Sequence, residues 1–244
     1  MASISDNTFG ARLRRAQDIV SFFPGFPNYS PPRPEENIEN FTALVTSISQ
    51  ANFNVSNLKE TYRVMVEKRR VAYRKNPDSL EKILVPVRAA VESRFGRRSA
   101  EARSVGSFIT KMRSVTLSKD PVDPTNPDAD KAHSTVQLSY GSMTQIFNDV
   151  IAALVSFNGY DPSNEKIKIA ALKERSAQMN AMNNDLAVLV QQVREKANAR
   201  FLLFEDLRDR VQRIKSYVKS EYGINSDQYK LIKGLKFKDD RKLI

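Results

Sequence analysis

Residues 207–222 read LRDRVQRIKSYVKSEY, and residues 80–95 read LEKILVPVRAAVESRF. In both stretches apolar side chains recur at steps of three and four residues, which places them on one face of an α-helix. Each position of this apolar stripe has a like residue 127 positions away: Leu80 and Leu207, Leu84 and Val211, Val87 and Ile214, Val91 and Val218, Phe95 and Tyr222. The two stretches predict equivalent amphipathic helices in an all-α protein.

The likeness extends beyond the stripe. A glycine follows each stretch, at Gly96 and Gly223, and residues 9–31 match residues 140–162 at an offset of 131. Two unrelated helices that each end in glycine are the alternative explanation. The conserved order of two matching blocks favours an internal duplication. We therefore predict two tandem, diverged copies of one helical unit, packed as helical bundles with a pseudo-twofold relation.

A proline-rich segment separates the two copies. Residues 120–127 read DPVDPTNP, and each proline removes a backbone donor and disfavours helical geometry in the residue before it. The predicted domains are a first helical repeat at residues 1–113, a Pro- and Asp-rich linker at 114–131 and a second helical repeat at 132–244.

Each copy is expected to hold a short helix, a middle helix, a long helix, a glycine cap and a final short helix. The first helices are predicted at residues 9–23 and 140–157. Asparagine-rich breaks at residues 52–57 and 183–184 are expected to separate the middle helices from the long ones. Pro77 should break the long helix of the first copy, because an interior proline costs about 3 kcal/mol.

The glycine caps are expected to set the direction of the final helices. Gly96 and Gly223 follow the last apolar position, where a left-handed conformation is common and glycine adopts it without a Cβ clash. Ser99 and Ser226 come three residues later and are predicted to cap the final short helices.

Composition excludes several kinds of chemistry. The chain contains no Cys, so it has no disulfide, thiolate zinc site, iron–sulfur cluster or cysteine nucleophile. The single histidine, His133, is interpreted as a surface residue because its neighbours are small or polar. No GxxxxGK[ST] or GxGxxG motif is present, which excludes nucleotide binding through those loops. We predict no cofactor, no metal site and no catalytic residue.

Carboxylates could still act in acid–base catalysis or hold magnesium. The densest groups fall in helical surface patterns with basic neighbours, which favours a structural role. They are Glu35, Glu36, Glu39, Glu205, Asp206 and Asp209. The expectation is a protein that is not an enzyme.

The chain is basic, with 39 Lys and Arg against 28 Asp and Glu and a formal charge of +11. Such an excess favours acidic partners. The strongest candidate site for an anion or nucleic acid is the basic cluster of the first copy, which comprises Lys68, Arg69, Arg70, Arg74, Lys75, Arg94, Arg97, Arg98 and Arg103. Interspersed glutamates leave an ordinary solvated face as the alternative.

The location in the cell is inferred from segments that the sequence lacks. No basic flank precedes an apolar run near Met1, and no stretch approaches 18 uninterrupted apolar residues. We therefore expect a cytoplasmic protein that does not bind membranes.

The second copy resembles a group of uncharacterised helical proteins from Bacteroidetes-type bacteria. The residues that carry the resemblance are STVQLSY at 134–140, YDPSNE at 160–165, VKSEYG at 218–223 and the stretch 226–237. The resemblance covers residues 134–237 and implies a bacterial helical protein without an assigned activity.

The leading functional hypothesis is a non-enzymatic helical scaffold, adaptor or assembly subunit that acts through protein–protein contacts. It implies a protein partner or self-assembly and no small-molecule substrate. A basic nucleic-acid- or ribosome-associated protein that uses the basic cluster is the first alternative. A structural component of a phage or a secretion apparatus is the second.

Overall fold

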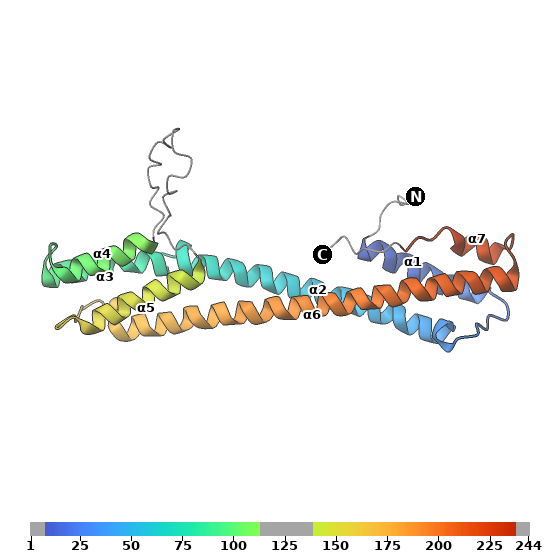
Figure 1. The fold of residues 1–244 in the computed structure, drawn as a ribbon, viewed down its shortest axis with the longest axis horizontal. Coiled ribbons are helices and arrows are strands. Elements are labelled where there is room, and N and C mark those ends of the chain that lie inside the picture. Colours follow the sequence, from blue (N-terminus) through green and yellow to red (C-terminus); the bar gives the residue numbers. More distant parts are fainter. Residues whose placement is uncertain (1–7, 113–138, 238–244) are drawn as a thin grey trace, which may run out of the picture. The chain divides into compact units, whose positions relative to one another are not determined.

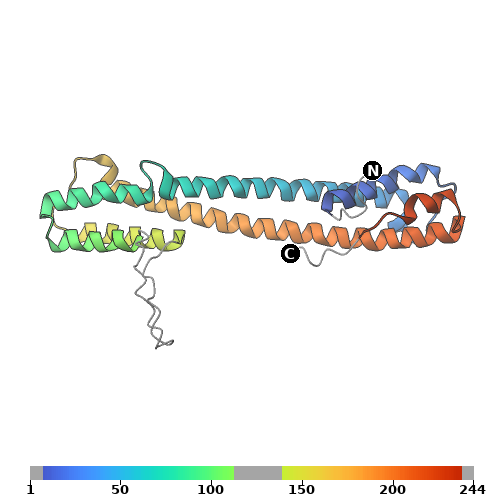
Figure 2. The same ribbon diagram turned by 90° about the horizontal axis from the view of Figure 1, so that it is seen from above.

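The computed structural model describes residues 8–112 and 139–237, and across these two ranges the chain is helical, with no β-strand (Figures 1 and 2). The predicted all-α class is confirmed. The predicted linker and His133 lie outside the described residues. None of the helices in the two ranges is both long and apolar enough to cross a membrane.

Seven α-helices follow one another along the described chain. They are α1 (Phe9–Phe22), α2 (Ile38–Arg70), α3 (Leu80–Phe95), α4 (Ala100–Met112), α5 (Tyr140–Ser156), α6 (Ile169–Tyr222) and α7 (Asp227–Lys233). Four short turns connect or extend them: the 3-10 turns η1 (Phe23–Gly25), η2 (Pro34–Glu36) and η4 (Glu165–Ile167), and the π-helical turn η3 (Val71–Lys75).

The breaks predicted at the asparagine-rich segments are absent, and that prediction was wrong. Helix α2 runs without interruption through residues 52–57, and α6 runs through residues 183–184 over a length of 54 residues. Asparagine in a helix interior costs at most about 0.7 kcal/mol relative to alanine. That cost is smaller than the free energy gained by burying one apolar side chain. Packing of the apolar face therefore determines that the helices continue through these segments.

The break predicted at Pro77 is confirmed. Helix α2 ends in the π-helical turn η3, and α3 restarts with Ser79 at its N-cap position. Helix α3 includes Pro86, in its second turn. The corresponding stretch of the second half, inside α6, contains no proline and stays helical.

Positive φ at the glycine caps is also confirmed, with a difference in detail. Gly96 has φ 95° and ψ 146°, which lies in a region that essentially only glycine occupies, rather than in the left-handed helical region. Its backbone N–H donates to the carbonyl of Glu92. Ser99 and Ser226 accept from the backbone N–H three residues on, as predicted for N-caps.

The described chain forms two compact units, and neither follows the predicted domain boundary. Unit 1 contains residues up to Thr61 and from Leu189 onward, and unit 2 contains residues Tyr62–Val188. Each unit therefore combines a part of residues 8–112, called the first half below, with a part of residues 139–237, called the second half. Helices α2 and α6 each contribute to both units.

Unit 1 contains α1, most of α2, most of α6 and α7. In Figure 1, α1 (blue) and α7 (red) lie side by side along α6, and the two short helices contact each other. The buried core combines Ala16, Ile19, Phe23, Phe41 and Ile48 from the first half with Leu207, Val211, Ile214, Val218 and Ile232 from the second.

Unit 2 contains the end of α2, η3, α3, α4, α5 and the start of α6. Helix α4 packs against both α3 and α5. The buried core combines Leu80, Leu84, Val87, Val91 and Val105 from the first half with Phe147, Val150, Leu154, Leu172 and Met179 from the second. The apolar stripe of residues 80–95 therefore lies in the core of unit 2, and that of residues 207–222 lies in the core of unit 1.

The bounds of the elements recur at two fixed offsets. Helix α5 begins 131 residues after α1, η4 begins 131 after η2, and α6 begins 131 after α2. Further along, α6 ends 127 residues after α3 ends, and α7 begins 127 after α4. The two offsets differ by four residues, and the segment Asn76–Ser79 between η3 and α3 has the same length.

Candidate interaction surfaces

The nine residues of the predicted basic cluster fall into two separate groups within unit 2. Five of them, in the range 68–75, lie on the last turn of α2 and on η3. The other four, in the range 94–103, surround the C-terminal end of α3. Helix α3 has 16 residues, which corresponds to about 24 Å at about 1.5 Å per residue. The structure therefore does not bring the predicted cluster together.

Two arginines of the first group pack on α5. The guanidinium carbon of Arg69 lies 4.2 Å from the centroid of the Tyr140 ring. Arg74 lies 5.9 Å from the same centroid, and its Nη2 is 3.9 Å from the sulfur of Met143. Stacking on an aromatic face stabilises a guanidinium by about 0.5–2 kcal/mol, so both side chains help to hold unit 2 together.

Two more members of the first group share one carboxylate. Arg70 donates to both oxygens of Glu67, at 2.7 and 2.8 Å, and Lys75 Nζ lies 3.6 Å from Glu67. The hydrogen bond from Arg70 lowers the pKa of Glu67 and raises the pKa of Arg70. One carboxylate thus offsets about half of the charge of these two residues.

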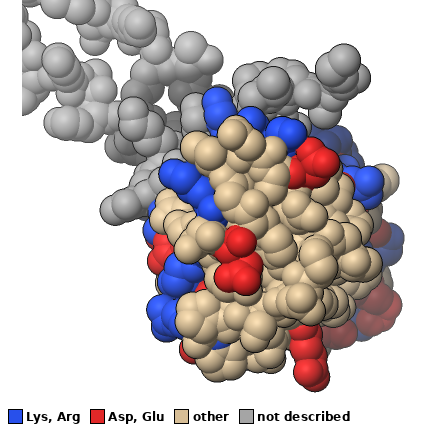
Figure 3. Space-filling view, turned by 90° about the vertical axis from the view of Figure 1, so that its right-hand side faces the viewer, with Lys and Arg blue, Asp and Glu red and all other residues tan. Residues whose placement is uncertain are grey.

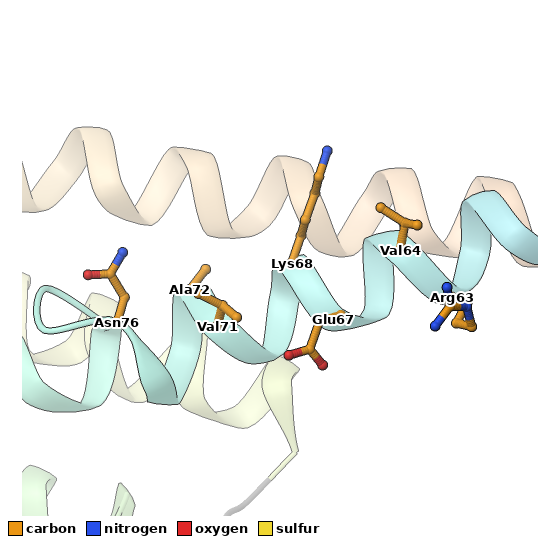
Figure 4. Close-up of a pocket in the computed structure, with 7 residues that line it drawn as sticks. All are labelled: Arg63, Val64, Glu67, Lys68, Val71, Ala72 and Asn76. Atoms are coloured by element: carbon orange, nitrogen blue, oxygen red, sulfur yellow. The ribbon is translucent and has the colours of Figure 1, made fainter.

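Lys68, the fifth member, borders a shallow hollow (Figure 4). Val71 and Ala72 supply apolar surface, together with Val64, which is 41% exposed. In Figure 4, Lys68 and Glu67 point to opposite sides of α2. The hollow is open and has opposite charges at its border, so it does not favour a particular ligand.

Among the described residues, the second group has neither the ion pairs nor the aromatic stacking that occur in the first group. Arg94, Arg97, Arg98 and Arg103 are exposed, and no ion pair joins them to another described residue. A Cβ at Gly159 would lie 2.9 Å from Nη2 of Arg94, so Arg94 lies against the backbone of the loop after α5. We call these four residues the arginine group of unit 2.

The equivalent turn of unit 1 carries different side chains. At the offset of 127, the positions of Arg97 and Arg98 are occupied by Ile224 and Asn225. Ile224 is 57% exposed, and Leu231, on the following helix, is 48% exposed. Figure 3 looks onto the end of unit 1 that holds the turn between α6 and α7, and uncharged side chains cover most of it. We call Ile224 and Leu231 the apolar pair of unit 1.

Within the described part of the chain, five of the six dense carboxylates, all except Glu39, form ion pairs, and one of these pairs joins two elements of unit 1. The side chain of Glu36 is 3% exposed and pairs with Arg213. Glu205 pairs with Arg208 at 2.9 Å. The remaining pairs are Asp206 with Arg210 at 2.8 Å, Asp209 with Arg208 at 3.1 Å and Glu35 with Arg33 at 3.7 Å. These contacts are between carboxylates and guanidinium groups, which is not the arrangement of a general acid and base.

Unit 2 also contains a buried polar cluster that was not predicted from the sequence. The hydroxyls of Tyr73 and Thr144 lie 2.5 Å apart, and the amide of Asn183 donates to Tyr73 at 2.8 Å. Tyr73 is fully buried. The three residues come from η3, α5 and α6 and are far apart in sequence, so no local pattern could have grouped them.

Two loop tyrosines have the same role in the two units. The hydroxyl of Tyr29 donates to the carbonyl of Glu36 at 2.9 Å, and that of Tyr160 donates to Ile167 at 3.0 Å. Burial raises the pKa of Tyr160 to about 12 and also raises that of Tyr29. Both hydroxyls stay protonated at neutral pH and fix the loop that leads into the long helix of each half.

The described residues contain no group of three or more His, Asp or Glu side chains that could hold a metal ion. The functional candidates that remain are therefore surfaces: the arginine group of unit 2 and the apolar pair of unit 1. Comparison with protein-family models, with curated proteins and with solved structures finds no match to this chain.

Proposed function

We propose that the protein is a non-enzymatic helical adaptor that joins two different macromolecular partners, one bound to each unit. A single observation carries the proposal: equivalent turns of the two units present opposite surface chemistry. Unit 2 has the arginine group around Gly96, and unit 1 has exposed Ile224 directly after Gly223 and exposed Leu231 on α7.

Each surface favours a partner of its own kind. Four exposed arginines that form no ion pair with another described residue attract an acidic surface and form bidentate contacts with carboxylates. Exposed Ile224 and Leu231 favour an apolar contact, because their burial in an interface removes about 25 cal/mol per Å² of apolar area from water. The proposed adaptor thus binds an acidic protein through unit 2 and an apolar protein surface through unit 1.

The test is a comparative affinity purification with two double variants. Arg97→Glu with Arg98→Glu should lose one set of partners and keep the other, and Ile224→Glu with Leu231→Glu should do the reverse. Lys59→Glu with Lys196→Glu, two exposed lysines on α2 and α6, has the same charge change as the arginine variant and should retain both sets. Loss of the same proteins in both test variants, or of none, would contradict two separate docking surfaces.

Nucleic-acid binding is the second candidate, and the unpaired arginine group favours it. In this proposal Arg94, Arg97, Arg98 and Arg103 would be the phosphate contacts, because these four members of the predicted cluster are exposed. A 20-mer oligonucleotide should then bind with an affinity that falls steeply with salt, with a slope that reports the number of phosphates neutralised. Arg97→Glu with Arg98→Glu should weaken binding and reduce that slope. Affinity that is independent of salt or of these substitutions would exclude this role.

We also propose that the two halves are diverged copies of one ancestral unit. Support comes from the element bounds, from the paired loop tyrosines, and from Asn28 and Gly159, which both have positive φ and are 131 residues apart. The register that fits the elements is 131 as far as Lys75 and 127 from Leu80 onward. Residues 76–79 are then a four-residue insertion in the first copy.

A further inference from the structure

The core of each unit is built from residues of both halves of the chain. In unit 1, α1 and the first part of α2 pack on the last part of α6 and on α7. In unit 2, α3 and α4 pack on α5 and the first part of α6. Neither half places its own first helix and its own last helix in the same unit. A half on its own would therefore leave both of its apolar faces without a partner.

Several contacts in unit 1 join the first half to the second. The rings of Phe9 and Phe204 lie 4.9 Å apart, and the guanidinium of Arg200 lies 3.8 Å from the Phe9 centroid. The backbone N–H of Ser30 donates to the Tyr217 hydroxyl at 3.0 Å. These contacts attach the start of the first half to the middle and end of the long helix of the second half.

The same kinds of contact occur in unit 2 with the halves exchanged. The rings of Tyr73 and Tyr140 lie 4.8 Å apart, and the guanidinium of Arg69 lies 4.2 Å from the Tyr140 centroid. Lys166 forms an ion pair with Asp78 at 2.7 Å. Here the start of the second half is attached to the middle and end of the first half.

The two sets of contacts correspond residue by residue. Arg200, Phe204 and Tyr140 lie 131 positions after Arg69, Tyr73 and Phe9, respectively. The Arg69–Tyr140–Tyr73 contact of unit 2 is therefore matched by the Arg200–Phe9–Phe204 contact of unit 1. Residue i of one half contacts residue j of the other, and the equivalent of j contacts the equivalent of i. That reciprocity is the property of an isologous interface between two copies of one subunit.

We propose that the two halves are each other's binding partners: they form a complete intramolecular heterodimer, which persists without a covalent connection and folds as one cooperative entity. The proposal rests on the contacts within each unit and not on the adaptor function. It predicts that the peptide connection between α4 and α5 serves only to keep the halves at a high effective concentration.

The experiment uses the full chain with a recognition sequence for a site-specific protease in place of residues 118–127. After cleavage, the two halves should elute together in size-exclusion chromatography, and native mass spectrometry should show a one-to-one complex. The circular dichroism spectrum at micromolar concentration should match that of the uncut chain. Separation of the halves under these conditions would overturn the proposal.

Dilution distinguishes mutual folding from two independent domains. If the halves fold only together, the melting temperature of the cleaved protein should fall as it is diluted tenfold and hundredfold. The matched control is the same chain carrying a scrambled protease sequence, whose melting temperature should not depend on concentration. Two transitions that ignore concentration after cleavage would mean that each half folds by itself, and would refute the proposal without affecting the docking surfaces.

Discussion

At the scale of single residues, the polar cluster of Tyr73, Thr144 and Asn183 is the clearest departure from an otherwise apolar packing rule. At the corresponding position the second half has Phe204, which fills the same kind of site without a hydroxyl. A buried donor without an acceptor costs about 1–3 kcal/mol. The hydroxyl of Tyr73 accepts a hydrogen bond from the amide of Asn183, which a phenylalanine at this position could not do.

Tyr73→Phe should accordingly lower the free energy of unfolding by about 1–2 kcal/mol, because the amide of Asn183 loses its nearer acceptor. Urea unfolding followed by circular dichroism measures the change. Replacing both partners, Tyr73→Phe with Asn183→Leu, should recover most of the loss. A double variant that is less stable than the single one would show that the cluster has a role beyond mutual hydrogen bonding.

A second residue-scale prediction concerns glycine. Gly96→Ala should destabilise the protein by about 1–2 kcal/mol, because φ is 95° there while the space around a new Cβ is empty. Gly106→Ala, inside α4 and equally open, is the matched control and should instead stabilise by about 0.5–1 kcal/mol. Thermal unfolding of both variants decides; shifts of the same sign would contradict the backbone argument.

At the scale of elements, local chemistry predicted the ends of helices well and their continuity poorly. Pro77 and Gly96 act through the backbone of their own residue, so the sequence alone places them. The asparagines of residues 52–57 act through a small propensity term, which the apolar packing of α2 outweighs. A weak local preference therefore cannot be converted into a helix end without knowing what the helix packs against.

The candidate site shows the same limit. Nine basic residues that are close in sequence were predicted as one cluster, but α3, which is about 24 Å long, separates the group at residues 68–75 from the group at residues 94–103. That separation follows from helix geometry and could have been predicted from the sequence. The stacking of Arg69 on Tyr140 could not have been predicted, because periodicity identifies a buried face but not the element that covers it.

Deletion of residues 76–79 tests the register at this scale. Joining Lys75 to Leu80 gives the spacing that Asp206 and Leu207 have in α6, so α2 and α3 should fuse into one helix. The variant should keep its cooperative unfolding, with a free energy within about 1 kcal/mol of the wild type. It loses the exposed Asp78–Lys166 ion pair, which contributes little because solvent screens it, but also the buried hydroxyl of Ser79, which has no hydrogen-bond partner among the described residues. Circular dichroism should show slightly more helix.

Insertion of the same four residues, NPDS, supplies the control. Placed between Asp206 and Leu207, the insertion should be tolerated, since it reproduces the arrangement of the first half. Placed between Val211 and Gln212, it should destabilise the protein by more than about 3 kcal/mol, because it divides the apolar stripe of α6 and introduces an interior proline. Equal effects at the two positions would show that the proposed register is wrong.

At the scale of the whole molecule, the division into units depends on whether the apolar stripe of each half packs against its own half or against the other half. Both halves carry the same apolar stripe, so the sequence is equally compatible with each half closing on itself. Two features of the chain favour the exchanged arrangement. The long helical stretch of the first half is α2 followed by α3, and that of the second half is α6. Each stretch has its start in one unit and its end in the other. Because α6 is one continuous helix, its two ends cannot fold back on each other.

The strongest prediction at this scale is that residues 132–244, expressed alone, form a homodimer. In such a dimer Phe204 would replace Tyr73 against Tyr140, and the buried positions Leu207, Val211, Ile214 and Val218 would replace Leu80, Leu84, Val87 and Val91. All replacements are apolar. Tyr217 and Tyr229 would occupy the positions that Ala90 and Ala102 have in the first half. Because tyrosine is larger than alanine, the surrounding side chains would have to shift to make room for the two rings.

Light scattering should therefore give twice the mass of the fragment, and the melting temperature should be lower than that of the full chain and rise with concentration. Ile214→Asp, which places a charge at a fully buried position, should abolish both the dimer and the helical signal together, since neither exists without the other. Residues 1–113 added in equimolar amount should displace one copy and restore the native pairing, because Tyr73 recovers its contacts with Thr144 and Asn183. A helical, monomeric fragment would contradict the reciprocal interface, since it would mean that one half can cover its own apolar stripe.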